Sequence, residues 1–423
     1  MQKRIQKAFS LKGEIIIPPD KSISHRAIIC ASLAKGNSII KNFSTGKDPH
    51  STLNICKNLG VEIEFKTNSE LIIKSCGTFN QYSSALDCGN SGTTMRLMAG
   101  VLAGQNFNSV LIGDKSLSQR PMKRIIKPLS MMGAKIETNE FKAPLKITGT
   151  NLQPINYISE LSSAQVKSCV LLAGLNIEGK TTFTEPYVSR NHTEILLKHM
   201  GANISTSNTS VSIEKSELSP IDINIFGDIS SAAYFIAAGL IVPDSEIILK
   251  NVGLNPTRTG ILTIAEKMGA NIEIIDKKEI LGEVVGDLKI KYSELQGTII
   301  EGEIIPQLID EIPIIAVLAT QAKGTTIIKD AQDLRNKESD RISTVVTELK
   351  KLGANIQETP DGMIIEGKTE LIGNCEIETY HDHRLAMSMF VAGLLCKKEI
   401  LINGFEWVDI SFPEFEKLFE TLA

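Results

Sequence analysis

The sequence predicts an α/β protein of two similar domains, each built from three βαβαββ units, with two crossover strands joining them. Two recurring elements carry this prediction, because an internal repeat with a fixed order of helices and strands indicates a repeated structural unit. The length of 423 residues suits two or three domains. Hydrophobic and charged contents of 42% and 22% are typical of a globular protein with an apolar core.

The first recurring element is a helix with a small residue at a fixed point, followed by a polar turn and a strand rich in β-branched residues. The small residue lets the helix lie close against its neighbours. Six copies occur, at 27–43, 95–112, 166–184, 232–252, 313–328 and 385–405, aligned on Ala31, Ala99, Ala173, Ala238, Ala316 and Ala392.

The second recurring element ends a helix with glycine and opens a strand. Glycine suits this point because a helix C-terminus often needs a left-handed backbone conformation. The two elements alternate, so each unit is predicted as strand, helix, strand, helix, strand, strand. Five copies carry the glycine, at Gly60, Gly133, Gly201, Gly269 and Gly353.

The sixth unit ends in a helix at 412–422 with no strand after it. Residues 8–18 have β character, and we expect them to complete that unit. The chain then crosses between domains near Pro18 and again near 225–228. The predicted domains are 20–226, and 1–19 with 227–423, with a cleft between them.

Composition excludes several classes of function. A net charge of −4 without any long Lys/Arg block argues against a nucleic-acid partner, and no apolar run reaches membrane-spanning length. The N-terminal residues have no apolar core typical of a secretory signal. The seven cysteines are scattered and never form Cys-x-x-Cys pairs, which favours a reducing cytoplasm and disfavours a zinc site or disulfides.

The segment 18–26 indicates an anion site. Pro18 and Pro19 stop an apolar strand, and Ser22 or Ser24 is expected to cap a helix over 27–33. Lys21 and Arg26 then lie near backbone N–H groups without helical partners, which favours a phosphate or carboxylate. An ordinary capped helix with solvated charges is the alternative.

The starts of the other five repeated helices carry similar groups. Glycine and hydroxyls expose backbone donors, and arginine recognises phosphate or carboxylate through paired hydrogen bonds. If the helices are arranged alike, their N-termini face one place that holds more than one anion. These starts are Asn90-Ser91-Gly92-Thr93-Thr94-Met95-Arg96, Ser162-Ser163-Ala164-Gln165, Asp228-Ile229-Ser230-Ser231, Asp310-Glu311-Ile312-Pro313 and His381-Asp382-His383-Arg384.

Each start also has a simpler interpretation. Asn90 to Thr93 fits a turn plus cap and is no P-loop. His381 and His383 suit a metal, but no further ligand clusters with them, so we expect Asp382 to cap the helix and Arg384 to be the working residue. Asp310 is either a normal acidic first turn or a general base among cations.

Two further motifs lie outside the helix starts. Lys337 and Arg341 are spaced i,i+4, which predicts one helical face, with a solvated charged surface as the default. Arg120 follows a strand in a loop, where arginine is more often on the surface.

Together the motifs resemble the enolpyruvyl transferases, and within them the branch that uses shikimate 3-phosphate. The resemblance covers essentially the whole chain and implies an inverse α/β barrel of two domains that close over the substrates. The implied reaction transfers the enolpyruvyl group of phosphoenolpyruvate to the 5-hydroxyl of shikimate 3-phosphate, with no cofactor or metal. The motifs are 18–26, Gly89 to Arg96, Gln119 to Met122, Lys337 to Arg341 and Asp382 to Arg384.

The resemblance also implies residue roles. Asp310 is the expected base for the 5-hydroxyl, and Lys21 and Glu338 are candidates for proton delivery. Shikimate 3-phosphate is expected to contact Lys21, Ser22, Arg26, Ser162, Ser163, Gln165, Ser189, Asp310 and Lys337. Phosphoenolpyruvate is expected to contact Lys21, Asn90, Gly92, Arg120, Gln165, Arg341 and Arg384.

One position departs from the family pattern. Many members carry Lys before the Ser/Thr-Phe-Pro near the C-terminus, whereas this chain has Ile410. The difference resembles the subgroup that tends to tolerate glyphosate, whereas Gly92 leaves room for that inhibitor, so we do not predict sensitivity.

The nearest alternative is the transferase that acts on UDP-N-acetylglucosamine. That family usually carries a reactive Cys before its Arg-Pro pair, and the loop 116–121 has none. A non-catalytic anion-binding protein has little reason to keep Lys21, Asp310 and Glu338 together. RNA-phosphate cyclase relatives share the repeat but not the motifs. The family resemblance implies a monomer.

Overall fold

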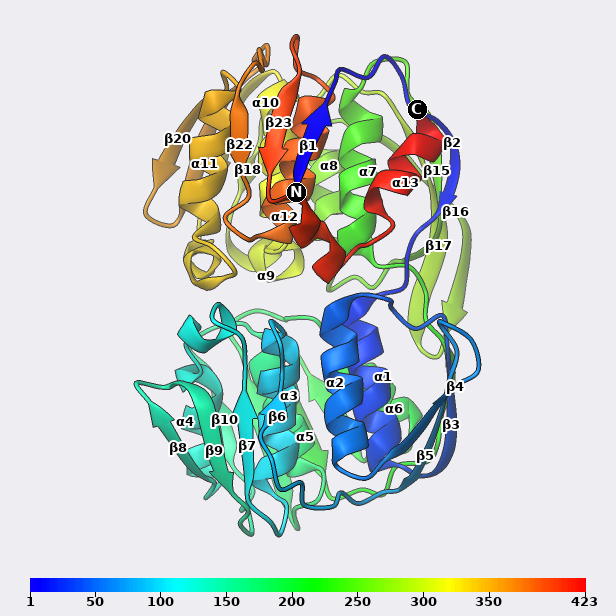
Figure 1. The fold of residues 1–423 in the computed structure, drawn as a ribbon, viewed down its shortest axis with the longest axis vertical. Helices are drawn as coiled ribbons and strands as arrows, with labels where there is room; N and C mark the ends of the chain where they lie inside the picture. Colours follow the sequence, from blue (N-terminus) through cyan, green and yellow to red (C-terminus); the bar gives the residue numbers. More distant parts are fainter. The chain divides into compact units, whose positions relative to one another are not determined.

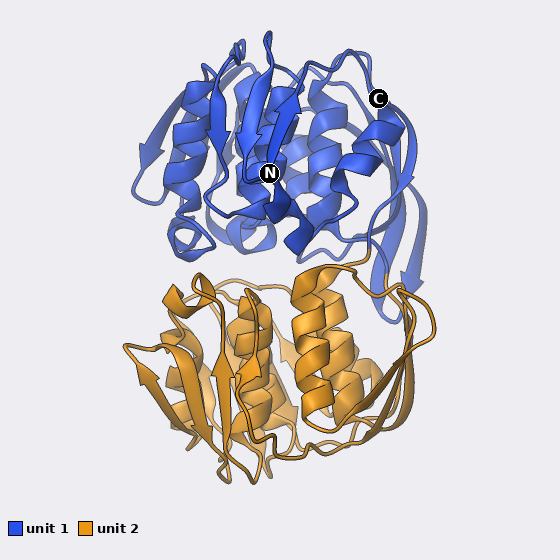
Figure 2. Cartoon of the chain, in the orientation of Figure 1, with its two compact units in different colours: residues 1–18, 226–423 blue, residues 19–225 orange.

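The chain divides into two compact units in the computed structural model, which describes residues 1–423 (Figure 2). Unit 2 is Pro19–Ile225, and unit 1 combines Met1–Pro18 with Phe226–Ala423. Both boundaries lie one residue before the predicted ones. Each unit has its own sheets and buried helices.

Unit 2 holds three four-stranded sheets. Its helices are α1 (Lys21–Leu33), α2 (Lys47–Asn58), α3 (Gly92–Ala103), η1 (Leu117–Gln119), α4 (Lys123–Met131), α5 (Ala164–Gly174) and α6 (His192–His199). Its strands are β3 (Lys35–Lys41), β4 (Glu62–Phe65), β5 (Leu71–Cys76), β6 (Leu86–Asp87), β7 (Ser109–Ile112), β8 (Lys135–Asn139), β9 (Lys142–Thr148), β10 (Asn156–Ile158), β11 (Lys180–Thr184), β12 (Ile204–Ser207), β13 (Ser210–Glu214) and β14 (Asp222–Asn224).

Unit 1 holds two four-stranded sheets and one three-stranded sheet. Its helices are α7 (Ile229–Ile241), α8 (Gly260–Lys267), η2 (Gly302–Ile304), α9 (Ile305–Leu308), α10 (Ile312–Gln321), η3 (Gln332–Asn336), α11 (Arg341–Lys351), α12 (His383–Gly393), η4 (Phe405–Ile410) and α13 (Phe415–Leu422). Its strands are β1 (Gln2–Ile5), β2 (Lys12–Ile16), β15 (Glu246–Gly253), β16 (Asn271–Ile280), β17 (Glu283–Lys291), β18 (Ile299–Ile300), β19 (Gly324–Ile328), β20 (Asn355–Thr359), β21 (Gly362–Gly367), β22 (Glu376–Glu378) and β23 (Ile400–Asn403).

Every four-stranded sheet has the same topology. In the sheet ordered β6-β7-β9-β8, β6 is parallel to β7, and β9 is antiparallel to both β7 and β8. The parallel pair needs a crossover, which α3 provides, while the antiparallel pair is a hairpin. The predicted βαβαββ unit and α/β fold class are therefore confirmed.

The prediction that residues 8–18 complete the sixth unit is wrong. β2 pairs in parallel with β15, in the first sheet of unit 1, whereas β1 pairs with β23 in the sixth sheet. β1 is a polar strand whose only buried side chain is Ile5, so its sequence shows no strand pattern. In the same way β14, which precedes the first helix of unit 1, pairs with β3 in unit 2. Each unit thus takes one strand from the segment that precedes the other unit's first helix.

The repeated helices form the interior of each unit, with the sheets outside them (Figure 1). In unit 1, α7, α10 and α12 pack against one another, and in unit 2 α3 packs against α1 and α5. A helix that is apolar all round is expected to be buried on every side, and α7 is buried at every residue except Ser231. The aligned alanines are all buried within these helices.

The predicted helix-ending glycines have the left-handed conformation. Their φ angles lie between +86° and +96°, just after α2, α4, α6, α8 and α11, at Gly60, Gly133, Gly201, Gly269 and Gly353. None of the helices combines the length and apolar character that a membrane crossing requires. No group of three or more His, Cys, Asp or Glu side chains is placed to hold a metal ion.

Candidate active site

The start of α1 differs from its prediction. Asp20, rather than Ser22 or Ser24, caps this helix by accepting a hydrogen bond from the Ile23 N–H at 2.8 Å. Asp is as good a cap as Ser, and the helix starts two residues earlier than with Ser22 as cap and four earlier than with Ser24. Lys21 is therefore the first residue of α1, and its Nζ lies 3.0 Å from the Asp48 carboxylate on α2.

Arg26 lies one turn further along α1 and is buried. Its Nε donates to Thr193 Oγ1 at 2.7 Å, and its Nη2 donates to Ser168 Oγ at 3.1 Å. Burial lowers the pKa of Arg26 to about 10, although Glu194 and Asp20 oppose that shift. The guanidinium therefore stays charged at neutral pH, held by hydroxyls from α5 and α6.

A buried chain of hydrogen bonds joins α1 to α3. Thr94 Oγ1 donates to the Ser91 hydroxyl at 2.8 Å, so it accepts from Thr52, which lies 2.7 Å away. Thr52 must then accept from His25 Nδ1, at 2.7 Å, which assigns the ring proton to Nδ1. Burial, with smaller contributions from Lys21 and Arg26, holds the pKa of His25 well below its usual value.

This environment predicts a pH-dependent stability. The folded state keeps His25 neutral, while the unfolded chain takes up its proton below about pH 6.5, so the free energy of unfolding falls as the pH falls through 6.5. The expected loss from this group is at most about 1.4 kcal/mol per pH unit. Urea unfolding at pH 7.5 and 5.5 measures it, and His25→Asn, whose amide replaces Nδ1, should flatten the slope. Exposed His199→Gln serves as the control; equal slopes in all three proteins contradict the assignment.

The start of α3 gathers four of the five predicted phosphoenolpyruvate residues of unit 2, all except Lys21. Ser91 caps the helix, and Gly92 is its first residue. Arg120 Nη2 donates to Asn90 Oδ1 at 2.8 Å, and Arg120 is buried rather than on the surface. A Cβ on Gly92 would lie 2.9 Å from Arg96 Nη1 and 3.5 Å from Arg120 Nη1, so glycine leaves room between two guanidiniums.

Two supporting residues at this point, Arg96 and Asp114, received no role from the sequence. Arg96 donates to Gln165 Oε1 at 2.5 Å, and Gln165 in turn donates to Thr93 at 2.9 Å. Arg96 is four residues after Gly92, so helical spacing was a usable signal. Asp114 accepts from the Asn90 amide at 2.7 Å, but nothing in the sequence marks that long-range pair.

The predicted serines occupy the start of α5 and the loop before α6. Ser163 caps α5 by accepting from the Val166 N–H, and Ser162 Oγ accepts from the Tyr187 N–H at 2.9 Å. Ser189 is buried, and its hydroxyl has no hydrogen-bond partner within the protein. The loop at Tyr187 to Ser189 thus lies beside the α5 N-terminus.

In unit 1 the predicted residues form one ion-pair network around Asp310. Its carboxylate lies 3.2 Å from Lys337 Nζ, 3.5 Å from Arg341 Nη1 and 3.9 Å from Arg384 Nη2. Glu338 accepts from Arg341 at 2.6 Å. The five site residues predicted in unit 1 therefore lie in one network: Asp310, Lys337, Glu338, Arg341 and Arg384.

Lys337 and Arg341 do not share a helical face. Lys337 follows η3 in an extended conformation, and α11 begins only at Arg341, with Asp340 as its cap. The Asp340 side chain offers a cap hydrogen bond, and capping residues take a non-helical backbone conformation. The side chains of Lys337 and Arg341 both reach Asp310, although a turn separates these two residues in the chain.

Neighbouring carboxylates in this network stabilise the charged form of its arginines. Burial by itself lowers the pKa of Arg384, but Asp310 and further neighbours raise it above its ordinary value. Arg341 donates to both oxygens of Asp382, at 2.8 and 3.1 Å. Burial favours the neutral form of Asp382, yet Arg341 keeps the pKa of that carboxyl below its usual range. As predicted, Asp382 also caps α12, through the Arg384 N–H.

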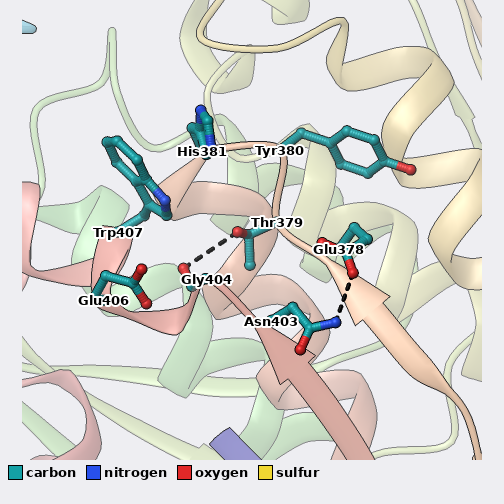
Figure 3. A pocket seen from close by; sticks show the side chains of 8 residues that line it. All are labelled: Glu378, Thr379, Tyr380, His381, Asn403, Gly404, Glu406 and Trp407. Atoms are coloured by element: carbon teal, nitrogen blue, oxygen red, sulfur yellow. Dashed lines mark hydrogen bonds between the residues drawn. The ribbon is translucent and has the colours of Figure 1, made fainter. Parts of the chain in front are cut away.

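A pocket of about 580 Å³ lies beside the turn that leads into Asp382 (Figure 3). Tyr380 and His381 have φ angles of +51° and +61°, which are costly for residues with side chains. Contacts hold the turn: Tyr380 donates to Glu348 at 2.8 Å, and the His381 ring packs on Trp407 at 4.6 Å. None of the predicted site residues lines this pocket.

The fold, together with the lysine and arginine side chains at the helix N-termini, defines the class of this protein. It is an enzyme for anionic substrates, of the enolpyruvyl transferase class. A family model of EPSP synthase (3-phosphoshikimate 1-carboxyvinyltransferase) matches residues 5–419. Two curated relatives named 3-phosphoshikimate 1-carboxyvinyltransferase, from Thermodesulfovibrio yellowstonii and Bacillus subtilis, are 53% and 50% identical. These alignments cover 100% of this chain and 100% of the first relative, and 97% of this chain and 96% of the second.

Solved structures point to the same family. An EPSP synthase from Acinetobacter baumannii superposes with a TM-score of 0.88 at 41% identity, covering 100% of this chain and 98% of the other. The enolpyruvyl transferase NikO from Streptomyces tendae shares the fold, with a TM-score of 0.79 at 15% identity over 99% of this chain and 96% of its own. The chain belongs to the EPSP synthase family. This membership confirms the predicted branch and disfavours the UDP-N-acetylglucosamine transferase.

Proposed function

We propose that this chain transfers the enolpyruvyl group of phosphoenolpyruvate to the 5-hydroxyl of shikimate 3-phosphate, releasing phosphate. The observation that carries the proposal is the Asp310 carboxylate among Lys337, Arg341 and Arg384. A carboxylate held ionised by cations can accept a proton next to an anionic substrate. Family membership over residues 5–419 supports the same reaction.

The chemistry is an addition followed by an elimination. Asp310 takes the proton of the 5-hydroxyl, and that oxygen forms a bond to C2 of phosphoenolpyruvate while C3 accepts a proton from Lys21 or Glu338. The tetrahedral intermediate then loses phosphate from C2 and a proton from the methyl carbon, which restores the double bond. The acid used in the first step regains its proton in the second, and the proton on Asp310 leaves with the phosphate.

The substrates divide between predicted groups. Arg26 is suited to the carboxylate of shikimate 3-phosphate, and Ser162, Ser163 and Ser189 to its phosphate, with Ser22, Gln165 and Lys337 completing its contacts. Asn90, Gly92, Arg120, Arg341 and Arg384 are suited to phosphoenolpyruvate, which brings a phosphate and a carboxylate.

The test is phosphate release measured with the purified chain. We expect release only when shikimate 3-phosphate and phosphoenolpyruvate are both present. Release with phosphoenolpyruvate and UDP-N-acetylglucosamine, or with phosphoenolpyruvate alone, contradicts the proposal.

Gly92→Ala is expected to raise the KM for phosphoenolpyruvate about 10-fold, since small displacements of positioned groups cost large factors in rate. The added Cβ displaces Arg96, which holds Gln165, while the flexible ends of both arginines let the chain fold. Steady-state kinetics measure the effect. Gly104→Ala, at the far end of α3, is the matched control because its Cβ meets only the flexible Leu152 side chain at 3.4 Å. Equal KM values for both variants contradict the role.

Several properties stay predictions. These are the monomeric state, the cytoplasmic location and independence from cofactors. Ile410, which stands where many family members carry Lys, is buried in η4 and offers no charge there.

A further inference from the structure

Unit 2 buries an ion triad that no step of the proposed reaction uses. Lys167 Nζ on α5 lies 2.8 Å from Glu185 Oε1 and 2.8 Å from Glu194 Oε1. The three side chains are 3%, 2% and 6% exposed, respectively. Removing three charges from water is costly, and apolar side chains of similar volume often stabilise a core as well. The triad therefore suggests a positional task.

The triad makes hydrogen bonds with both the backbone carbonyl and the backbone N–H of Ser189. Lys167 Nζ donates to the Ser189 carbonyl at 3.0 Å, and the Ser189 N–H donates to Glu185 Oε1 at 2.8 Å. The Ser189 hydroxyl is buried and has no protein partner. Because a buried hydroxyl without a partner is unfavourable, this one is placed for a group that the protein does not supply.

The same two helices hold Arg26. Ser168 follows Lys167, and Thr193 precedes Glu194 in the sequence. Their hydroxyls lie 2.6 Å apart, and both accept hydrogen bonds from the Arg26 guanidinium. The ion triad thus fixes α5 to α6 at the point where Arg26 is held.

We infer that Lys167, together with Glu185 and Glu194, is a positioning residue for shikimate 3-phosphate. It holds the Ser189 hydroxyl and the Arg26 guanidinium where the phosphate and carboxylate of that substrate are received. The inference rests on the proposed function, which supplies the substrate. Lys167 itself touches no substrate and acts through Ser189 and Arg26.

The first test is Lys167→Met. The two glutamates then lose their shared cation, and the Ser189 carbonyl loses its donor, so the loop before α6 shifts. We expect the KM for shikimate 3-phosphate to rise 10- to 100-fold, with the KM for phosphoenolpyruvate and kcat within about 3-fold of wild type. Lys167→Arg, which keeps the charge, should recover most of this loss. Lys215→Met, which breaks the exposed Lys215–Glu178 pair of the same unit, is the matched control.

A double-mutant cycle distinguishes positioning from stability alone. The dissociation constant of shikimate 3-phosphate is measured by calorimetry for Lys167→Met, Ser189→Ala and their combination. If Lys167 acts through Ser189, the double variant binds shikimate 3-phosphate no more weakly than whichever single variant binds that substrate less tightly. Additive losses, or equal changes in the KM of both substrates, overturn the inference.

Should Lys167→Met not fold, Glu185→Gln replaces it. This near-isosteric change weakens the ion pair with Lys167 and the hydrogen bond from the Ser189 N–H. It should therefore raise the KM for shikimate 3-phosphate 3- to 10-fold. An unchanged KM overturns the inference. Failure of the proposed function is recognised separately, because wild type then shows no phosphate release with both substrates.

Discussion

Replacing Asp310 with asparagine is expected to lower kcat by about 10²- to 10⁴-fold, the range that general acid–base catalysis supplies. Asparagine keeps the shape of the side chain but cannot accept the proton of a hydroxyl. Lys337, Arg341 and Arg384 keep their charges while their shared anion is lost. The KM for phosphoenolpyruvate should therefore stay equal or fall.

Steady-state kinetics on Asp310→Asn separate a base from a binding group, because loss of a binding group raises KM instead. Asp276→Asn is the matched control. Asp276 is an exposed residue of unit 1 with a φ of +49°, a conformation that Asn tolerates as well as Asp. A kcat within 3-fold of wild type, or a KM increase without a loss of kcat, removes Asp310 from the role of base.

The repeat was predictable because it depends on local rules. A glycine with positive φ after a helix is needed whatever the tertiary context, and Gly60 and its four equivalents follow that rule. The aligned alanines were likewise predictable, since the helices that carry them form the interior of each unit. In contrast, β1 presents only one buried side chain, so its pairing with β23 left no pattern to recognise.

Site residues divide in the same way. Those within a motif, such as Asp382 as cap of α12, could be assigned from neighbouring residues. Spacing misled at Lys337 and Arg341, because Asp340 starts a new helix between them. The partners that hold the motifs in place come from distant segments: Asp48 for Lys21, and Lys167 for Ser189. Such pairs depend on packing, which a single sequence does not encode in any local pattern.

The second large effect is expected for Lys21→Met, which should lower kcat/KM by about 10⁴-fold or more, because it removes both a proton donor and a charge-assisted hydrogen bond. Lys21 is the first residue of α1, where the helix N–H groups and its own ammonium both favour an anion. Methionine matches the length of the lysine stem but has neither the charge nor the donors. Kinetics with both substrates saturating and limiting measure the loss.

Lys21→Met also leaves Asp48 without the ammonium 3.0 Å away, so some loss of stability is expected alongside the loss of activity. The double variant Lys21→Met with Asp48→Asn removes the uncompensated carboxylate and should regain the thermal stability of wild type while staying inactive. Lys74→Met, which breaks an exposed pair with Glu62 in the same unit, controls for a general effect of losing one lysine. Activity within 10-fold of wild type in the double variant would show that Lys21 is needed neither to bind the substrates nor to move a proton, and the helix start at α1 would then serve the fold alone.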